Sequence, residues 1–235
     1  MVEKYNTNTY SSLSKFFYAA DRVAGKKRKE MVYSAIDLSQ EVSIDLMCVT
    51  SILDVGTTAD ESLSSSNLIL KILAPGKRVS SLSDHAVDAS LASFSYINEY
   101  ILGDITQVEF STSGYDLVIC SAVLEHCGSK ERQVQAIVNL LGAADKYLFL
   151  TVPNRWFPIE LHSKLPLIHY LPKNLYRFLY RLFGFKELAL ESNLNYISHS
   201  SISNEIRKFD PSLQIRVEKI RLFGFCSNYL FIVKS

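Results

Sequence analysis

Short apolar runs alternate with helix-like segments between residues 48 and 153, and this alternation limits the possible folds more than any other feature. The runs are SILDV (51–55), KRVSSLS (77–83), EYILGD (99–104), YDLVIC (115–120) and YLFLTV (147–152). Helix-like segments separate them at 62–75, 84–94 and 130–145. Strands apolar on both faces that alternate with helices are typical of a parallel sheet covered on both sides.

Two further runs close the chain, QIRVEKIRLFGF (214–225) and SNYLFIVKS (227–235), near enough in sequence to pair antiparallel. Together with the five earlier runs they predict an α/β fold: a doubly wound, Rossmann-like, mostly parallel seven-stranded sheet with an antiparallel C-terminal strand pair. We expect residues 46–235 to form this domain.

The N-terminal segment 1–45 is expected to be helical. Residues 11–40 indicate two helical pieces, with GKKRK (25–29) as the exposed junction between them. The cations of this junction are interpreted as a solvated helix start rather than as a binding site for nucleic acid or lipid.

Charge and cysteine usage exclude several classes of protein. The 25 Lys and Arg against 24 Asp and Glu give a net charge of +1, which provides no overall basic field for nucleic acid. The four cysteines are scattered and form no CxxC pair, which suits a reducing compartment. No signal sequence or membrane-spanning run is recognised, so we expect a cytoplasmic protein, with peripheral contact at the inner membrane surface left open.

Polar residues follow the first four strands at the ends where parallel sheets bind ligands. Asp54-Val55-Gly56 follows the first strand, Ser83-Asp84 the second, Gly103-Asp104-Ile105 the third, and Ser121-Ala122 with Glu125-His126 the fourth. A glycine admits close backbone approach, and the two acids could accept hydrogen bonds from a ribose and from an adenine amino group. These strand ends outline a nucleoside pocket.

The motifs ILDVG, ILGDI and YDLVICSAVLEH occur in an order and spacing that resembles the class I S-adenosylmethionine-dependent methyltransferases. The resemblance covers roughly residues 48–155 and the closing strand pair. It implies S-adenosylmethionine as the cofactor and methyl transfer to a small-molecule acceptor as the reaction. The cofactor-binding positions that it implies are Asp54, Gly56, Thr57, Thr58, Asp84, Asp104, Ile105, Ser121 and Ala122.

A narrower likeness lies in TVPNRWFPIELHSKLPLIHYLPK (151–173), which resembles a bacterial subgroup of these enzymes with a TPNRWFPIEFHT-type loop. Its prolines and aromatics indicate an aromatic lid insertion at about 153–190 rather than a linker. Asn154, Arg155 and Trp156 are the expected substrate-binding residues. The likeness implies a reaction and not a particular acceptor, so a lipid-linked, a quinone-type and a glycan precursor all stay open.

The first loop departs from the family pattern D/ExGxGxG, because Thr58 and Asp60 stand at the later glycine positions. The hydroxyls of Thr57 and Thr58 could then contact the amino-acid end of the cofactor. The departure also motivates the alternative of a catalytically inactive methyltransferase-like binding or assembly module.

Methyl transfer from a sulfonium mainly requires that the donor and the acceptor be held in line, with a general base if the acceptor is a hydroxyl. His126 and His162 are the candidate bases, the first beside the fourth strand and the second on the lid. No HxxxH, CxxC or acidic cluster indicates a metal. No GxGxxG fingerprint supports a nicotinamide or flavin enzyme.

The segment 173–185 carries a stripe of cations, Lys173, Arg177 and Arg181, beside an apolar one. This pattern fits packing on the sheet or contact with an anionic membrane surface.

Overall fold

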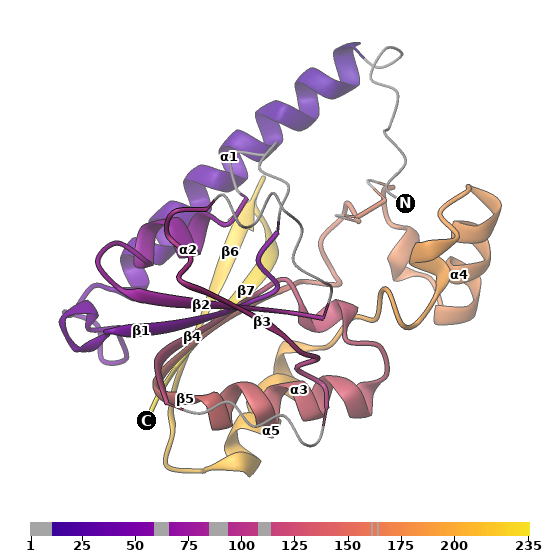
Figure 1. Cartoon of the computed structure of the whole chain (residues 1–235). Coiled ribbons are helices and arrows are strands. Elements are labelled where there is room, and N and C mark those ends of the chain that lie inside the picture. The colour runs from indigo at the N-terminus through magenta and orange to yellow at the C-terminus, as the bar shows by residue number, and fades with distance from the viewer. Residues whose placement is uncertain (1–10, 59–65, 85–93, 108–113, 161, 164) are drawn as a thin grey trace.

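The computed structural model describes residues 11–58, 66–84, 94–107, 114–160, 162–163 and 165–235 (Figure 1). The described strands form one seven-stranded sheet in the order β3-β2-β1-β4-β5-β7-β6. The strands are β1 (Ser51–Val55), β2 (Arg78–Ser83), β3 (Glu99–Leu102), β4 (Tyr115–Ser121), β5 (Ala144–Pro153), β6 (Gln214–Leu222) and β7 (Phe225–Lys234).

The sheet confirms the predicted topology. The first five strands are parallel, whereas β7 runs antiparallel to both β5 and β6. Strand order reverses between β1 and β4, so the carboxyl ends of these two strands mark the crevice where open α/β sheets bind ligands. The β6–β7 hairpin turns through Phe223 and Gly224, both with positive φ, as a two-residue hairpin connection requires.

Helices cover both faces of the sheet (Figure 1). The described α-helices are α1 (Ser11–Ala35), α2 (Leu68–Leu73), α3 (Lys130–Ala143), α4 (Lys173–Leu182) and α5 (His199–Phe209). One core cluster joins α1 and α2 to the strand residues that include Ile52 and Leu230, and the other joins α3 and α5 to those that include Leu53 and Phe231. Neighbouring strand residues thus face opposite layers, as the two-sided apolar runs predict.

The N-terminal prediction is wrong in one respect, because residues 11–35 form one continuous helix and not two pieces. Gly25 lies inside this helix. A single glycine destabilises a helix by only about 1 kcal/mol relative to alanine, and packing of the helix can offset that loss. The end of α1 is tied to β6, where the Arg216 guanidinium donates to the carbonyls of Ser34 (3.3 Å) and Val42 (3.1 Å).

Helix α5 is an element that the sequence patterns did not predict. The Ser198 hydroxyl accepts a hydrogen bond from the Ser201 amide and caps its first turn. Ile202 and Ile206, four residues apart, are its fully buried contacts with the sheet. The expected helix at 84–94 lies almost wholly outside the described residues, as do positions 62–65 of the helix expected at 62–75.

The segment between β5 and α5 forms a separate small layer, with α4 projecting from the sheet (Figure 1). It has its own hydrophobic cluster, in which Tyr176 and Tyr180 of α4 pack with Ile168, Ala189 and Leu194. We call residues 154–197 the lid. Its boundary with the domain, and the division at residue 45, stay predictions.

Candidate functional site

Gly56 holds the turn after β1 in a conformation that other residues rarely adopt. Its φ is +82°, and a Cβ atom built on it would lie 2.5 Å from Cγ2 of Val123. Its amide donates to the Leu82 carbonyl at 2.9 Å, which fixes the turn against β2. This position therefore requires glycine, because any other residue would be strained at this φ and would overlap Val123.

Asp54, two residues earlier, is buried at 6% exposure. The Thr57 hydroxyl donates to its carboxylate, and the Ser81 hydroxyl donates to Thr57 Oγ1 at 2.8 Å. Burial raises the pKa of Asp54 to about 6, against the opposing effect of the Thr57 hydrogen bond. The Thr57 hydroxyl is thus directed at Asp54 and not into a cavity.

Two cavities, of about 430 and 270 Å³, meet at Val55 and Gly56. The larger one lies against the ends of β2 and β3, the smaller one against the end of β4 and the start of α2. Of the predicted cofactor-binding residues, Asp84, Asp104 and Ile105 line the first cavity, Asp54, Thr58, Ser121 and Ala122 line the second, and Gly56 lines both. Thr57 lines neither, and Asp60 lies outside the described residues.

The carboxylate of Asp104 is engaged from four sides. Its Oδ1 accepts from the Thr106 amide (2.8 Å) and hydroxyl (2.7 Å), and its Oδ2 accepts from Gln107 (3.0 Å) and from Arg132 (2.8 Å). Burial alone would raise the pKa of Asp104, but these hydrogen bonds and the Arg132 charge outweigh it and lower the pKa. An adenine amino group would therefore have to replace one of these donors.

The end of β4 places a second strained residue at the smaller cavity. Ala122 has a φ of +57°, and its amide donates to the Thr151 carbonyl at 3.0 Å. Ser121 shares a hydrogen bond between hydroxyls with the same threonine at 2.9 Å. These contacts with β5 hold the turn that leads into the 3₁₀ helix η3 (Leu124–His126).

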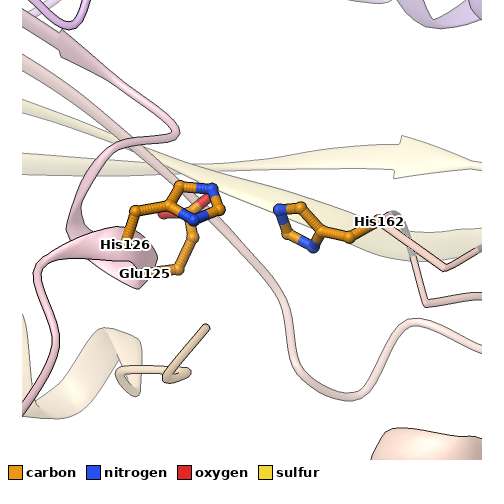
Figure 2. A group of neighbouring side chains, drawn as sticks. All are labelled: Glu125, His126 and His162. Carbon is orange, nitrogen blue, oxygen red and sulfur yellow. The ribbon is translucent and has the colours of Figure 1, made fainter. Parts of the chain in front are cut away.

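Glu125 and His126 of η3 meet His162 of the lid, and we call these three residues the Glu125 cluster. Figure 2 shows the two imidazole rings facing each other with the Glu125 carboxylate beside them. The ring centroids are 5.0 Å apart, and one potential ligand atom from each residue lies within 4.8 Å of the others. The structure thus brings the two predicted histidines together with the carboxylate of Glu125, a residue noted at the end of the fourth strand but given no role there.

Each histidine of the Glu125 cluster is held through Nδ1. His126 Nδ1 lies 2.6 Å from the Asn193 carbonyl, and His162 Nδ1 lies 2.7 Å from Oε1 of Glu160. Both contacts fit an Nδ1–H donor, which leaves the Nε2 lone pairs free. Partial burial lowers the pKa of His126, despite the opposing effect of the Asn193 carbonyl.

Glu160 anchors this part of the lid. It accepts hydrogen bonds from the amides of His162 and Ser163 and from the Tyr196 hydroxyl (2.6 Å). Burial alone would raise its pKa, but the His162 contacts and these donors outweigh burial and lower the pKa. Nothing in the sequence distinguishes Glu160 from an exposed glutamate of the lid, because its hydrogen-bond donors are brought to it only by the fold.

The predicted substrate residues behave differently from one another. Asn154 donates to the Cys226 carbonyl of β7 (2.8 Å) and ties the start of the lid to the sheet. Arg155 donates to the carbonyls of His169 (3.2 Å) and Leu171 (3.3 Å) and holds the lid together. Trp156 is 62% exposed. None of the three lines the two cavities.

Arg28 is a cavity residue that the sequence analysis interpreted as solvated. It lies on α1 and lines the smaller cavity with Asp54 and Ala122. Burial lowers the pKa of its guanidinium, against the effect of Asp21. Its position became visible only from the packing of α1, because the GKKRK run itself does not distinguish its four cations.

The sequence matches no protein-family model and no curated protein. Solved structures share its fold. N-methyltransferase NodS from Bradyrhizobium japonicum WM9 is 13% identical with a TM-score of 0.52, over 89% of this chain and 95% of that one. Magnesium protoporphyrin IX methyltransferase (ChlM) from Synechocystis PCC 6803, with bound SAM, is 16% identical with a TM-score of 0.51, over 99% and 86%.

A candidate Zn-dependent alcohol dehydrogenase from Rhodobacter sphaeroides is also similar, at 14% identity and a TM-score of 0.55, over 79% of this chain and 84% of that one. Identities this low establish architecture alone. The mostly parallel seven-stranded sheet with its antiparallel β7 matches the methyltransferase neighbours. The chain therefore has the Rossmann-like α/β fold of the class I methyltransferases.

Proposed function

We propose that the protein transfers a methyl group from S-adenosylmethionine to a small-molecule acceptor. The observation that carries this proposal is the pair of cavities that meet at Gly56, at the reversal of strand order between β1 and β4. Their arrangement suits a ligand with two ends, a nucleoside in the larger cavity and an amino acid in the smaller one. Both NodS and ChlM have been solved with S-adenosyl compounds bound, which supports the assignment.

The charges of the smaller cavity support the same ligand. Arg28 offers a cation for a carboxylate, and Asp54 offers a carboxyl group for an ammonium or sulfonium. Thr58 stands where the family pattern has a second glycine, and its backbone is fixed by the Asn67 side chain through two hydrogen bonds of 3.1 and 2.8 Å. The Asn67 amide thus holds this loop at the edge of the smaller cavity.

His126 lines the larger cavity, so the proposed general base is His126, with His162 behind it as the alternative. Either ring offers a free Nε2 lone pair for the acceptor proton. The residues of the lid nearest to this cavity, Ser192 and Asn193, would then contact the acceptor.

Calorimetric titration with S-adenosylmethionine and its demethylated product tests the cofactor assignment. We expect saturable binding of both, lost in Gly56→Val because its side chain would overlap Val123. Asp210→Asn, directly after α5 and outside the lining of both cavities, is a control that should bind normally. Absence of binding at millimolar ligand would contradict the enzyme and favour the inactive binding module.

Transfer itself is tested with methyl-labelled cofactor and a small-molecule extract of the host. Label should appear in a product with the parent protein and not with Gly56→Val. Cofactor binding without transfer to any acceptor in the extract, including its lipid fraction, would favour the inactive module instead.

We further propose that α4 contacts an anionic membrane surface, which would suit a lipid-linked acceptor. Leu175, Phe178 and Leu182, which recur at helical spacing, are 45%, 57% and 66% exposed. Two of the three cations predicted beside them, Lys173 and Arg177, form ion pairs with Glu191. The proposed membrane contact therefore depends more on the exposed apolar side chains than on the cations. No helix in the described part of the chain is long and apolar enough to cross a bilayer.

Sedimentation with anionic and zwitterionic vesicles tests this surface. Phe178→Ser with Leu182→Ser should abolish binding to anionic vesicles, whereas joint substitution of Lys173, Arg177 and Arg181 by Gln should reduce it, because two of these cations are already paired with Glu191. Val217→Ser, an exposed apolar residue of β6, is the matched control. Unchanged sedimentation of both variants would contradict the proposal.

A further inference from the structure

The Glu125 cluster has the composition of a transition-metal site. It presents two imidazoles and one carboxylate, with a potential ligand atom of each within 4.8 Å of the others. We propose that the cluster binds one divalent first-row transition metal ion, for which Zn²⁺ is the probe. Imidazole nitrogen favours this class of ion, whereas Mg²⁺ prefers oxygen ligands alone.

The hydrogen bonds behind the histidines are those of metal ligands. Metal-binding histidines almost always donate their second ring N–H to a carboxylate or a backbone carbonyl, which fixes the tautomer and the ring orientation. His126 has the Asn193 carbonyl in this place, and His162 has the Glu160 carboxylate. Both therefore present Nε2, with a lone pair, to the centre of the cluster.

Glu125 gives an independent indication. It is 1% exposed, and its Oε2 has no hydrogen-bond partner among the described residues. A buried carboxylate oxygen without a donor is costly, because native proteins satisfy nearly all such atoms. A metal ion would satisfy this oxygen, and its charge would offset the burial of the carboxylate.

The spacing fits after a small adjustment. Zinc lies at about 2.0–2.2 Å from nitrogen and oxygen ligands, which places tetrahedral ligand atoms roughly 3.4 Å apart. Ligand atoms that lie up to 4.8 Å apart must therefore approach each other by up to about 1.4 Å. His162 can supply this movement, because it lies on the lid and is only partly buried, at 23% exposure of its side chain.

The cluster also has an open side. His126 lines the larger cavity together with Gly56 and Asp104, so a fourth ligand could enter from there. Three protein ligands and one exchangeable position are the arrangement of catalytic rather than structural zinc. If the proposed methyl transfer holds, an acceptor oxygen in that position would become more acidic and more nucleophilic. This role and the general-base role exclude each other, because both use the same Nε2 lone pairs.

Titration of the metal-free protein with Zn²⁺, without S-adenosylmethionine, tests the site. We expect one zinc ion per chain, a raised midpoint of thermal unfolding, and much weaker binding of Mg²⁺. Glu125→Gln keeps the buried volume and should weaken zinc binding more than about tenfold, as should His162→Ala. His199→Ala is the control, since this exposed histidine stacks on Tyr229 away from the cluster.

Unfolding in urea without metal separates loss of a ligand from loss of the fold. Glu125→Gln should be at least as stable as the parent protein, because it removes a buried carboxylate, yet zinc should stabilise it less than it stabilises the parent. Parent protein that fails to bind zinc, or equal zinc binding by parent, Glu125→Gln and His162→Ala, would overturn the proposal. Tighter binding of Mg²⁺ than of Zn²⁺ would overturn the class of metal. None of these outcomes depends on cofactor binding, so the two proposals fail separately.

Discussion

Asp54→Asn should stabilise the ligand-free protein near neutral pH. The folded protein raises the pKa of this carboxyl group from 3.8 to about 6 by burial. That difference corresponds to about 3 kcal/mol of unfavourable free energy for holding the ionised form. The amide of the variant has the same shape and no charge, and its oxygen can still accept from Thr57. Its NH₂ group has to be buried as well, so we expect a net gain of about 1–3 kcal/mol at pH 7.

The sign of the pH dependence follows from the raised pKa. The folded state holds the Asp54 proton more tightly than the unfolded state, so this group destabilises the protein progressively as the pH rises from about 4 to about 6. The variant lacks this dependence. Its advantage over the parent should therefore be small near pH 4, grow up to about pH 6, and stay constant above.

Urea unfolding of both proteins at half-unit steps from pH 4 to pH 8 measures this difference, and other titrating groups cancel in the comparison. Asp145→Asn, at an exposed position of β5, is the control and should give a curve parallel to that of the parent. A stability difference between Asp54→Asn and the parent that is the same at pH 4 and pH 7 would refute the reasoning. So would a loss of stability at pH 7, because it would mean that the ionised carboxylate is stabilised by the fold.

Three further perturbations have definite expected outcomes. Gly56→Ala should lower the free energy of unfolding by about 2–4 kcal/mol, because it combines an unfavourable φ of +82° with a 2.5 Å contact to Val123. Adding Val123→Ala should restore only the part of this loss that comes from the contact. Full recovery of stability in the double variant would contradict the φ argument. Asp116→Asn should change stability in the direction opposite to Asp54→Asn, because Lys146 and Thr50 lower the pKa of Asp116. Ionised Asp116 therefore stabilises the fold above about pH 4, and this stabilisation is lost as the pH falls. In the same urea assay the variant should lose about 1–2 kcal/mol of the free energy of unfolding at pH 7. Phe231→Ala should lower the free energy of unfolding by about 3–5 kcal/mol, because this fully buried side chain lies in β7, between β5 and β6. A thermal unfolding midpoint that falls by only about one or two degrees would contradict this, since it would mean that the core closes around the cavity.

The sheet could be predicted from the sequence because each strand is a short apolar run with a clear end. The residues at those ends were predicted for the same reason, since carboxyl ends of parallel strands converge. Residues 11–35 were harder, because one glycine among cations suggests a break, and only packing against β6 shows that the helix continues. Helix α5 was missed because its serines and its two buried isoleucines give a weak periodic signal.

The Glu125 cluster could not have been predicted by motif spacing. Two of its members are adjacent in the sequence, and the third lies on the lid, so no metal-binding pattern relates them. The orientation of each ring depends on Asn193 and Glu160, which are ordinary polar residues in the sequence. Only the folded chain shows that the lid brings His162 to η3.

The position of β7 has a consequence for how the chain is made. β6 pairs only with β7 among the described strands, and β7 occupies the place between β5 and β6. While a ribosome is still producing residues 225–234, the edge of β5 has no neighbour and β6 has no place in the sheet. The runs 147–153 of β5 and 229–233 of β7, which are buried in the folded protein, are then still unpaired with each other, while β1 to β4 can already pair. Until β7 is complete, the chain therefore exposes an unpaired apolar edge of β5, which is the kind of edge that pairs with other chains and promotes aggregation.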